Sequence, residues 1–438
     1  MRELFTNALI VNEGAVSHGW VLVDGDRIAA TGTGECDMKA ETVTDCEGCY
    51  LLPGVIDTHV HFRDPGLTEK ATMVTESKAA VAGGVTSFID MPNTKPATVS
   101  MEAAMYKMAR ASRVSEANYG FFIGATNDNF DELAGADYTR LAGVKLFLGS
   151  STGNMLVDDE KMLDNLFGNA PSIIAVHAED EKVIAEARER LKALYPGGIP
   201  VELHPDVRPR EACIRATYHA IMLAERYGAR VHICHISTAE ELDMIARAKA
   251  RGVRVTAETC PQYLLFDRND FLRLGSRIKC NPAIKDPSDR VALIRALRKG
   301  GVIDTIATDH APHLPKDKDG DALTAASGMP MVQFSLPAML DLAEYDPDAE
   351  DIGIERVVEL MCHAPARIFG IKERGFIRPG YYADLVLVEK LPLPGYKIKK
   401  TDVKSKCGWT PLLGRSLGYR VRRTVVNGGR GARPLEFE

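Results

Sequence analysis

The sequence predicts an α/β protein: a (β/α)8 barrel of the TIM type, accompanied by a small β-sandwich domain built from both chain ends. Short apolar runs rich in β-branched residues alternate with longer amphipathic segments through the middle of the chain, which is typical of repeated βα units around a parallel sheet. Eight such runs are present, the number that closes a barrel of this type. Both ends instead carry short alternating stretches, and neither end has enough of them to enclose a core alone.

Residues 1–54 are expected to form strands rather than helices. Two apolar stretches flank the sequence Asp24-Gly25-Asp26, which is a signal for a hairpin turn. Strand-like stretches return near the other end, after a Pro-Gly turn, at residues 381–388 and 423–429. We therefore expect residues 1–54 and 371–438 to form one composite β-sandwich domain and residues 55–370 to form the barrel.

The eight candidate strands of the barrel are residues 55–60, 85–90, 118–123, 144–148, 173–177, 231–235, 253–258 and 303–308. Amphipathic segments that fit crossover helices lie at residues 179–194, 210–227, 239–251 and 288–299. The interval between the fifth and sixth strands is longer than one crossover usually needs. Its portion from Pro196 to Pro209 is therefore expected to be an inserted loop.

Composition and charge restrict the class of partner. With 45% hydrophobic and 26% charged residues, the chain has the composition of a soluble globular protein. The net charge is −6 and no basic block is interleaved with aromatic residues, which argues against a nucleic-acid or membrane-surface partner. A small-molecule substrate is the expected partner. The start of the chain lacks a signal-peptide pattern and the nine cysteines are scattered, so we expect a cytoplasmic location and reduced thiols.

Residue types suited to metal binding stand on or directly after five of the expected strands. His59 and His61 share one face of the first strand, because alternate side chains of a strand point to the same side. The others are Lys145, His177, His235 and Asp309. Catalytic groups of such barrels lie at the carboxyl ends of the strands, so these six are expected to meet on one rim. Any one histidine could be an ordinary core or surface residue, but the whole set predicts a metal site.

Lys145 does not fit this set as an amine. An ammonium group has no lone pair to offer and is repelled by divalent cations. A lysine nitrogen that has reacted with carbon dioxide becomes a carbamate, a bidentate anion that can bridge two metal ions. The alternative interpretation is a buried lysine paired with an acid.

The ligand pattern resembles the amidohydrolase superfamily, and the motifs around it resemble the dihydroorotase family. The motifs that carry this resemblance are His59-Val60-His61-Phe62-Arg63-Asp64-Pro65-Gly66, Met91-Pro92-Asn93-Thr94, Asn281-Pro282 and Thr308-Asp309-His310-Ala311-Pro312-His313. The resemblance implies two Zn²⁺ per subunit, bridged by carboxylated Lys145 and a hydroxide. It further implies reversible cyclisation of N-carbamoyl-L-aspartate to L-dihydroorotate, a step of pyrimidine synthesis. Asp309 is the expected catalytic residue, first as general base and then as general acid.

The resemblance also implies how the substrate is bound. Arg63, Asn93 and His313 are expected to hold the free carboxylate, with the arginine as a planar bidentate donor. Asn281, together with backbone near Gly328, is expected to contact the pyrimidine ring.

Two other functions are compatible with this pattern. One is another cyclic amidohydrolase: allantoinases typically lack an arginine at the position of Arg63, and hydantoinases typically lack the Met-Pro-Asn-Thr match. The other is a non-catalytic scaffold with the same fold, but such proteins usually lose metal ligands and this chain keeps all six. A homodimer and an association with a transcarbamoylase are left open by the sequence.

Overall fold

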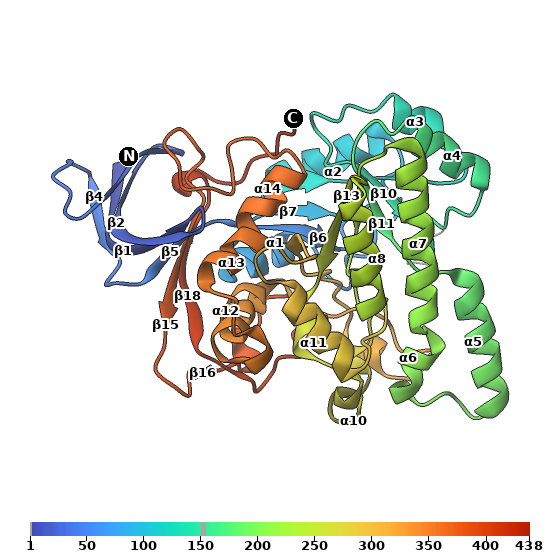
Figure 1. Ribbon diagram of the computed structural model, residues 1–438. Helices are drawn as coiled ribbons and strands as arrows, with labels where there is room; N and C mark the ends of the chain where they lie inside the picture. Colours follow the sequence, from blue (N-terminus) through green and yellow to red (C-terminus); the bar gives the residue numbers. More distant parts are fainter. Residues whose placement is uncertain (1, 150–154) are drawn as a thin grey trace.

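The computed structural model describes residues 2–149 and 155–438, and at its centre parallel strands form a closed ring (Figure 1). The strands of this ring are β6 (Val55–Val60), β7 (Val85–Asp90), β8 (Asn118–Phe121) with its continuation β9 (Ile123–Gly124), β10 (Val144–Phe147), β11 (Ile174–His177), β12 (Val231–Ile233), β13 (Val255–Thr259) and β14 (Thr305–Ile306). Each pairs in parallel with the next along the chain. The ring closes where Val60 pairs with His310, and the His61 amide donates to the His310 carbonyl at 2.8 Å. All eight expected strands are confirmed, with ends that differ by a few residues.

Helices cover the outside of the ring (Figure 1). The described α-helices are α1 (Met73–Ala82), α2 (Met101–Val114), α3 (Phe130–Ala134), α4 (Glu160–Gly168), α5 (Glu181–Leu194), α6 (His204–Val207), α7 (Arg210–Tyr227), α8 (Ala239–Ala250), α9 (Pro261–Leu265), α10 (Phe271–Leu274), α11 (Pro287–Ala296), α12 (Ser335–Tyr345), α13 (Ile354–Val358) and α14 (Ala364–Ile368). The four expected crossover helices are confirmed as α5, α7, α8 and α11. No described helix is long and apolar enough to cross a membrane.

Local sequence signals explain where these helices begin and end. Thr238 caps α8: its hydroxyl accepts from the Glu241 amide, and the Glu241 side chain accepts from the Thr238 amide in return. Gly228 ends α7 with a left-handed φ of 68°, a conformation that costs glycine little.

The expectation of a plain inserted loop from Pro196 to Pro209 is wrong in part. This portion contains the short helices η1 (Val201–Leu203) and α6, and prolines stand where a helix tolerates them, before η1 and in the first turn of α6. His204 and Val207 of α6 line the main cavity of the protein. The insertion therefore contributes to the site instead of only linking two units.

The strands near the two chain ends share one sheet. Its strands are β1 (Arg2–Asn12), β2 (Ala15–Asp24), β3 (Arg27–Thr33), β4 (Thr42–Asp45), β5 (Tyr50–Pro53), β15 (Leu385–Lys390) and β18 (Tyr419–Val425). The order is β18-β15-β5-β1-β2-β3, with β4 also paired to β1, so β5 joins the early strands to the late ones.

This sheet is curved around a hydrophobic cluster of its own, which combines side chains such as Phe5, Val21 and Leu385 (Figure 1). An isolated bridge between Arg27 and Tyr382 brings β3 back to the later part of the chain. The pairing gives one continuous sheet, and its description as a two-layer sandwich, like the domain boundaries, stays a prediction.

A late segment of the chain returns to the barrel. Between β16 (Tyr396–Lys397) and β17 (Ser416–Leu417), Cys407, Trp409 and Leu412 join the hydrophobic cluster of the barrel. The Trp409 indole donates a hydrogen bond of 2.8 Å to the carbonyl of His313. This segment thus supports a loop that carries an expected substrate-binding residue.

Candidate metal centre and substrate pocket

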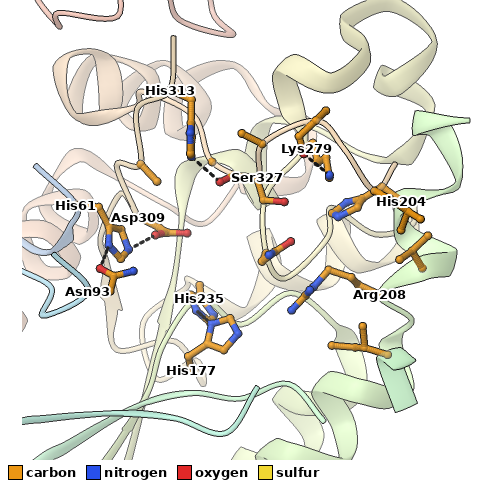
Figure 2. Close-up of a pocket in the computed structure, with 18 of the residues that line it drawn as sticks. His61, Asn93, His177, His204, Arg208, His235, Lys279, Asp309, His313 and Ser327 are labelled. Atoms are coloured by element: carbon orange, nitrogen blue, oxygen red, sulfur yellow. Dashed lines mark hydrogen bonds and ion pairs between the residues drawn. The ribbon is translucent and has the colours of Figure 1, made fainter. Parts of the chain in front are cut away.

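The six predicted metal ligands meet at one rim of the barrel, as expected. All of them line a cavity of about 670 Å³, and each is less than a tenth exposed (Figure 2). The four predicted substrate-binding residues, Arg63, Asn93, Asn281 and His313, line the same cavity. The parallel strands bring these residues together because each strand ends at the same rim.

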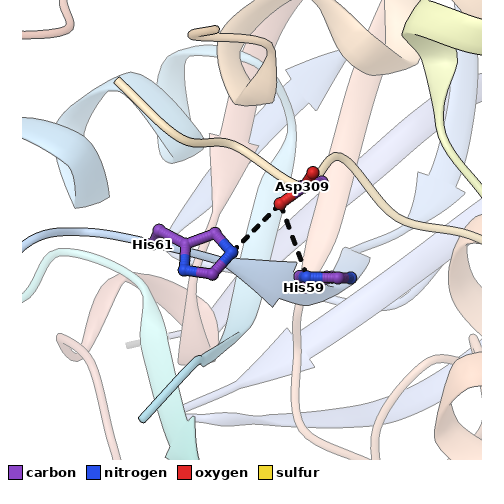
Figure 3. A group of neighbouring side chains, drawn as sticks. All are labelled: His59, His61 and Asp309. Carbon is purple, nitrogen blue, oxygen red and sulfur yellow. Dashed lines mark ion pairs between the residues drawn. The ribbon is translucent and has the colours of Figure 1, made fainter. Parts of the chain in front are cut away.

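The first half of the centre consists of His59, His61 and Asp309 (Figure 3). One carboxylate oxygen, Asp309 Oδ1, lies 3.0 Å from His61 Nε2 and 3.4 Å from His59 Nε2. On the other side of each ring, Nδ1 lies 2.7 Å from an oxygen, that of Glu258 for His59 and that of Asn93 for His61.

The tautomers follow from these partners. Because each Nδ1 faces an acceptor, it carries the hydrogen, and the lone pair of each Nε2 then points at the Asp309 oxygen. Lone pairs that face each other at this distance need a cation or an added proton between them. The donor set of two imidazoles and a carboxylate is one that zinc uses.

Electrostatics distinguish the two histidines of this half. Burial lowers the pKa of His59, but the Glu258 and Asp309 carboxylates outweigh it and raise the pKa to about 10. Burial also acts on His61 and lowers its pKa to about 4, although Asp309 opposes this shift. Burial alone would raise the pKa of Asp309, but the two histidines hold it well below its ordinary value. Asp309 is therefore a carboxylate throughout the physiological range.

The second half of the centre consists of His177 and His235. His177 Nδ1 and His235 Nε2 lie 2.8 Å apart and face each other, and both residues line the cavity. His177 Nε2 points the other way and lies 3.1 Å from Glu179 Oε2 without forming a hydrogen bond. Arg208 anchors Glu179 through bonds to both carboxylate oxygens, so this acid is a fixed support behind His177.

Lys145 lies between these halves in the barrel and is fully buried. Its nitrogen contacts the Cys234 sulfur at 3.1 Å and stands 5.2 Å from the Phe147 ring. Within residues 2–149 and 155–438, no carboxylate lies at ion-pair distance from it. The alternative of a lysine paired with an acid therefore finds no partner in the described chain.

Backbone conformation sets the direction of three site residues. Arg63, His235 and Asp309 have left-handed φ angles of 64°, 43° and 45°. Residues other than glycine occupy this region at a cost, and such residues cluster at functional sites. Here each of them stands two or three residues after the end of a barrel strand, and its side chain lines the cavity.

Arg63, Lys70 and His313 form a polar group in one wall of the cavity. Arg63 Nη2 lies 3.1 Å from His313 Nε2, while the same Nε2 donates to the Ser327 carbonyl at 3.0 Å. Lys70 Nζ approaches the other ring nitrogen, Nδ1, at 3.3 Å. Burial, with the charges of Arg63 and Lys70, lowers the pKa of His313 to about 2, so its ring is neutral. The single N–H of neutral His313 is therefore taken up by Ser327, and the guanidinium of Arg63 is the donor that suits an acceptor such as a carboxylate.

Asn93 and Asn281 differ in whether the side-chain oxygen already accepts a hydrogen bond within the described chain. The Asn93 amide oxygen is committed to His61, so Asn93 orients a metal ligand in addition to any contact with substrate. Asn281 Oδ1 is buried and has no hydrogen-bond partner among the described residues. A buried acceptor of this kind at a cavity wall suits an N–H donor of a ligand.

The cavity lining is strongly cationic. It includes seven lysines and arginines, namely Arg63, Lys70, Lys145, Arg188, Lys192, Arg208 and Lys279, whereas Asp309 is its one carboxylate. Arg208 is neutralised by Glu179, which stands behind the lining. Arg188 and Lys192 also have acid partners, Glu181 and Glu189. The charges of Arg63, Lys70 and Lys279, which form no ion pair in the described chain, favour an anionic substrate.

Several supporting residues were missed in the sequence. Glu258 had a visible signal, an acid at the end of a strand expected to be buried, and it holds His59 and also contacts His232 and Thr58. The Glu179–Arg208 pair and Lys70 had no such signal, because ordinary surface positions carry the same residue types.

Comparison with known proteins finds one matching family model and relatives over most of the chain. A model of the amidohydrolase family matches residues 50–429. A relative named dihydroorotase, from Halobacterium salinarum, is 35% identical over 412 residues, which cover 93% of this chain and 92% of the relative. A relative named allantoinase, from Solibacter usitatus, is 33% identical over 428 residues, 96% of this chain and 91% of the relative. Among solved structures, an L-hydantoinase from Arthrobacter aurescens aligns with a TM-score of 0.92 at 27% identity, covering all of this chain and 97% of that one.

Proposed function

Since the chain belongs to the amidohydrolase family, we propose that this hydrolase is a dihydroorotase, which interconverts N-carbamoyl-L-aspartate and L-dihydroorotate. Relatives with that name, at 31–35% identity over at least nine tenths of the chain, support the proposal. The observation that carries it is the buried guanidinium of Arg63, whose N–H donors have no acid partner in the described chain and which lines the same cavity as the metal ligands. A dihydroorotate molecule carries a carboxylate outside its reacting amide, and these donors are suited to it.

We infer that the centre takes two zinc ions. His59, His61 and Asp309 would hold one ion, His177 and His235 the other, and a carboxylated Lys145 both. The burial of Lys145 and its lack of an acidic partner in the described chain support the carbamate. When bound, the metal pair supplies Lewis acidity to the reacting carbonyl and lowers the pKa of a water molecule.

The protein groups then have separate tasks. Asp309 turns Oδ1 to the two histidines, so Oδ2 remains to take a proton from the attacking water and to deliver it to the leaving ring nitrogen. Arg63 holds the carboxylate, with His313 beside it, and this fixes the ring relative to the centre. Asn281 Oδ1 is suited to a ring N–H. Burial of all these groups keeps bulk water away from the reacting amide.

A second candidate is another cyclic amidohydrolase. Relatives named allantoinase are 30–33% identical to this chain, and solved structures with the same fold are hydantoinases. Allantoin and simple hydantoins carry no carboxylate outside the ring, so a site for them has no use for the Arg63 donors. A homodimer, an association with a transcarbamoylase and a cytoplasmic location stay predictions.

One experiment tests the proposal. The purified protein is loaded with zinc, its metal content is measured, and initial rates are recorded on dihydroorotate, N-carbamoyl-L-aspartate, allantoin and hydantoin. We expect two zinc ions per chain and the highest kcat/KM on dihydroorotate and N-carbamoyl-L-aspartate. Turnover of allantoin or hydantoin alone would replace the proposal with the second candidate.

A further inference from the structure

Four successive backbone carbonyls in one wall of the cavity are each held by a side-chain donor. This wall is the segment 325–328, whose Ser327 appears in Figure 2. The Ala325 carbonyl accepts from Lys279 Nζ and the Ser327 carbonyl from His313. The carbonyls of residues 326 and 328 both accept from Lys318 Nζ, at 2.6 and 2.8 Å. A short segment fixed at every peptide group is a rigid surface rather than an ordinary loop.

Lys318 has an unusual environment for a lysine. It ends the short helix η4 (Pro315–Lys318), and only 3% of it is exposed. Its third hydrogen bond, 3.0 Å long, goes to the carbonyl of Lys279, so all three ammonium hydrogens are used. In the described part of the chain no carboxylate pairs with it, and its charged neighbours Arg63 and Lys279 are cations. Burying a cation without an acidic partner costs folding free energy, so a lysine in this position indicates a function for its ammonium group.

The bonds of Lys318 join two stretches that line the cavity. Lys279 lies two residues before Asn281, whose side-chain oxygen is buried without a partner in the described chain. The Gly328 amide donates to the Lys279 carbonyl at 2.8 Å, beside the bond from Lys318 to the same oxygen. Gly328 has a φ of +128°, and a Cβ there would lie 2.6 Å from the Ala311 carbonyl, so the backbone packs closely here and leaves no room for a side chain. Lys318 itself does not line the cavity.

We propose that Lys318 is a positioning residue that locks the turn before Asn281 to the segment 325–328, and so sets the polar wall against which the substrate ring is bound. This inference rests on the proposed function, because it takes that wall to be the ring-binding side of the site. Lys318 acts through the groups it holds and not by contact with substrate. The loss of its ammonium would leave the carbonyls of residues 326 and 328 without a donor and the Lys279 carbonyl with the Gly328 amide alone, and so allow the two stretches to separate.

The matched pair of variants is Lys318→Met and Lys316→Met. Methionine has similar length but no donors, and Lys316 is an exposed neighbour on the same short helix. For Lys318→Met we expect the KM for dihydroorotate to rise roughly 10- to 100-fold, the usual effect of losing hydrogen bonds to a charged group. Its zinc content should be unchanged and its kcat within about threefold of wild type. Lys316→Met should match wild type, and an unchanged KM in Lys318→Met would overturn the proposal.

The pH dependence of KM separates positioning from a general structural role. Burial lowers the pKa of Lys318 to about 7; Lys279 and Arg63 act in the same direction, Cys280 opposes them, and the facing His313 is neutral. Above that pH the neutral amine has two hydrogens for three carbonyls. The KM of the wild type should therefore increase as the pH rises above about 7, and the KM of Lys318→Met should not show this increase. Identical pH profiles of KM in the two proteins would overturn the role.

Hydrogen exchange tests the same point in the unmodified protein, in case the methionine variant does not fold. Protection of the Gly328 amide, corrected for intrinsic rates, should fall as the pH rises through 7, while amides of α5 keep theirs. Equal protection of the Gly328 amide below and above pH 7 would overturn the proposal. If the proposed function is wrong, the wild type will turn over a different cyclic amide. The KM values of wild type and Lys318→Met are then compared on that substrate.

Discussion

Three of the four imidazoles of the metal centre have an oxygen behind them. His59 is held by Glu258, His61 by Asn93, and Glu179 stands behind His177. Such supports orient a ligand and choose its tautomer, and their removal commonly costs 10- to 100-fold in metal affinity or activity. The ligands could be predicted from the sequence because each stands at the end of a buried run. Their supports could not, because the contacts cross the barrel between strands far apart in the chain.

Lys145→Ala tests the bridge. This change should remove more than about 99% of the hydrolytic rate and lower the zinc content, because a bidentate anion between two cations is lost. A short carboxylic acid in excess should restore part of both. The rates and metal content of the exposed control Lys161→Ala should equal those of wild type, and full activity with normal zinc in Lys145→Ala would exclude the bridging role.

Arg63→Met tests the substrate. A bidentate arginine contact to a carboxylate in a buried site contributes on the order of 2–4 kcal/mol, so kcat/KM on dihydroorotate should fall roughly 30- to 1000-fold. The rate on an uncharged cyclic imide should change little, and zinc content should be unaffected. Lysine at this position keeps the charge without the planar donor pair and should give an intermediate value. Near wild-type efficiency of Arg63→Met on dihydroorotate would contradict the assignment.

At the scale of elements, the late segment between β16 and β17 is the feature that sequence patterns did not reveal. Its hydrophobic residues have no helical or strand period, so nothing in the chain indicated that they pack on the barrel. In the structure, Glu76 of α1 links this segment to the rim. It accepts from Ser405 and from the Lys406 amide, and it lies 2.8 Å from the His310 ring.

Glu76→Gln should therefore destabilise the protein, by about 2 kcal/mol at neutral pH, because a buried charge-assisted network is weakened. Burial opposes the charged form of Glu76, but the bond and charge of His310 outweigh it, so its pKa is lowered on folding. A lowered pKa means that the stabilisation is complete above the unfolded value, near 4.5, and is lost as the pH falls through the folded value.

The difference between wild type and Glu76→Gln, measured by denaturant unfolding, should accordingly be constant from pH 6 to 8 and shrink below about pH 4.5. The exposed Glu186→Gln on α5 is the control and should change stability by less than about 0.5 kcal/mol. A difference that grows in acid would instead mean that folding raises the pKa of Glu76.

For the molecule as a whole, the barrel was the predictable part. Eight runs of a parallel sheet that are buried almost throughout have a strong hydrophobic signal, and their order follows the chain. For the sheet at the chain ends, the sequence predicted only that strands from both ends belong to the same domain. Its order, β18-β15-β5-β1-β2-β3, depends on pairings between strands separated by more than 300 residues, for which the sequence holds no local signal.

The charge balance of the overall reaction gives a prediction for the direction of catalysis. Ring closure converts one carboxylate into an amide carbonyl and takes up one proton, so the synthetic rate should rise as the pH falls and the hydrolytic rate as the pH rises. Initial rates in both directions from pH 6 to 9 would show this as crossing profiles. Parallel profiles would mean that one ionisation limits both directions, contrary to the proposed chemistry.

The place of β5 between β1 and β15 has a consequence for how the chain is made. During synthesis β1 to β5 leave the ribosome first, but the partner of β5 on its other side, β15, follows only after the entire barrel. Until β15 has been made, one edge of β5 has unpaired backbone N–H and C=O groups, and such edges pair with other chains. Nascent or truncated chains that lack β15 and β18 are thus the form of this protein most exposed to aggregation, and the completed chain closes its own early edge.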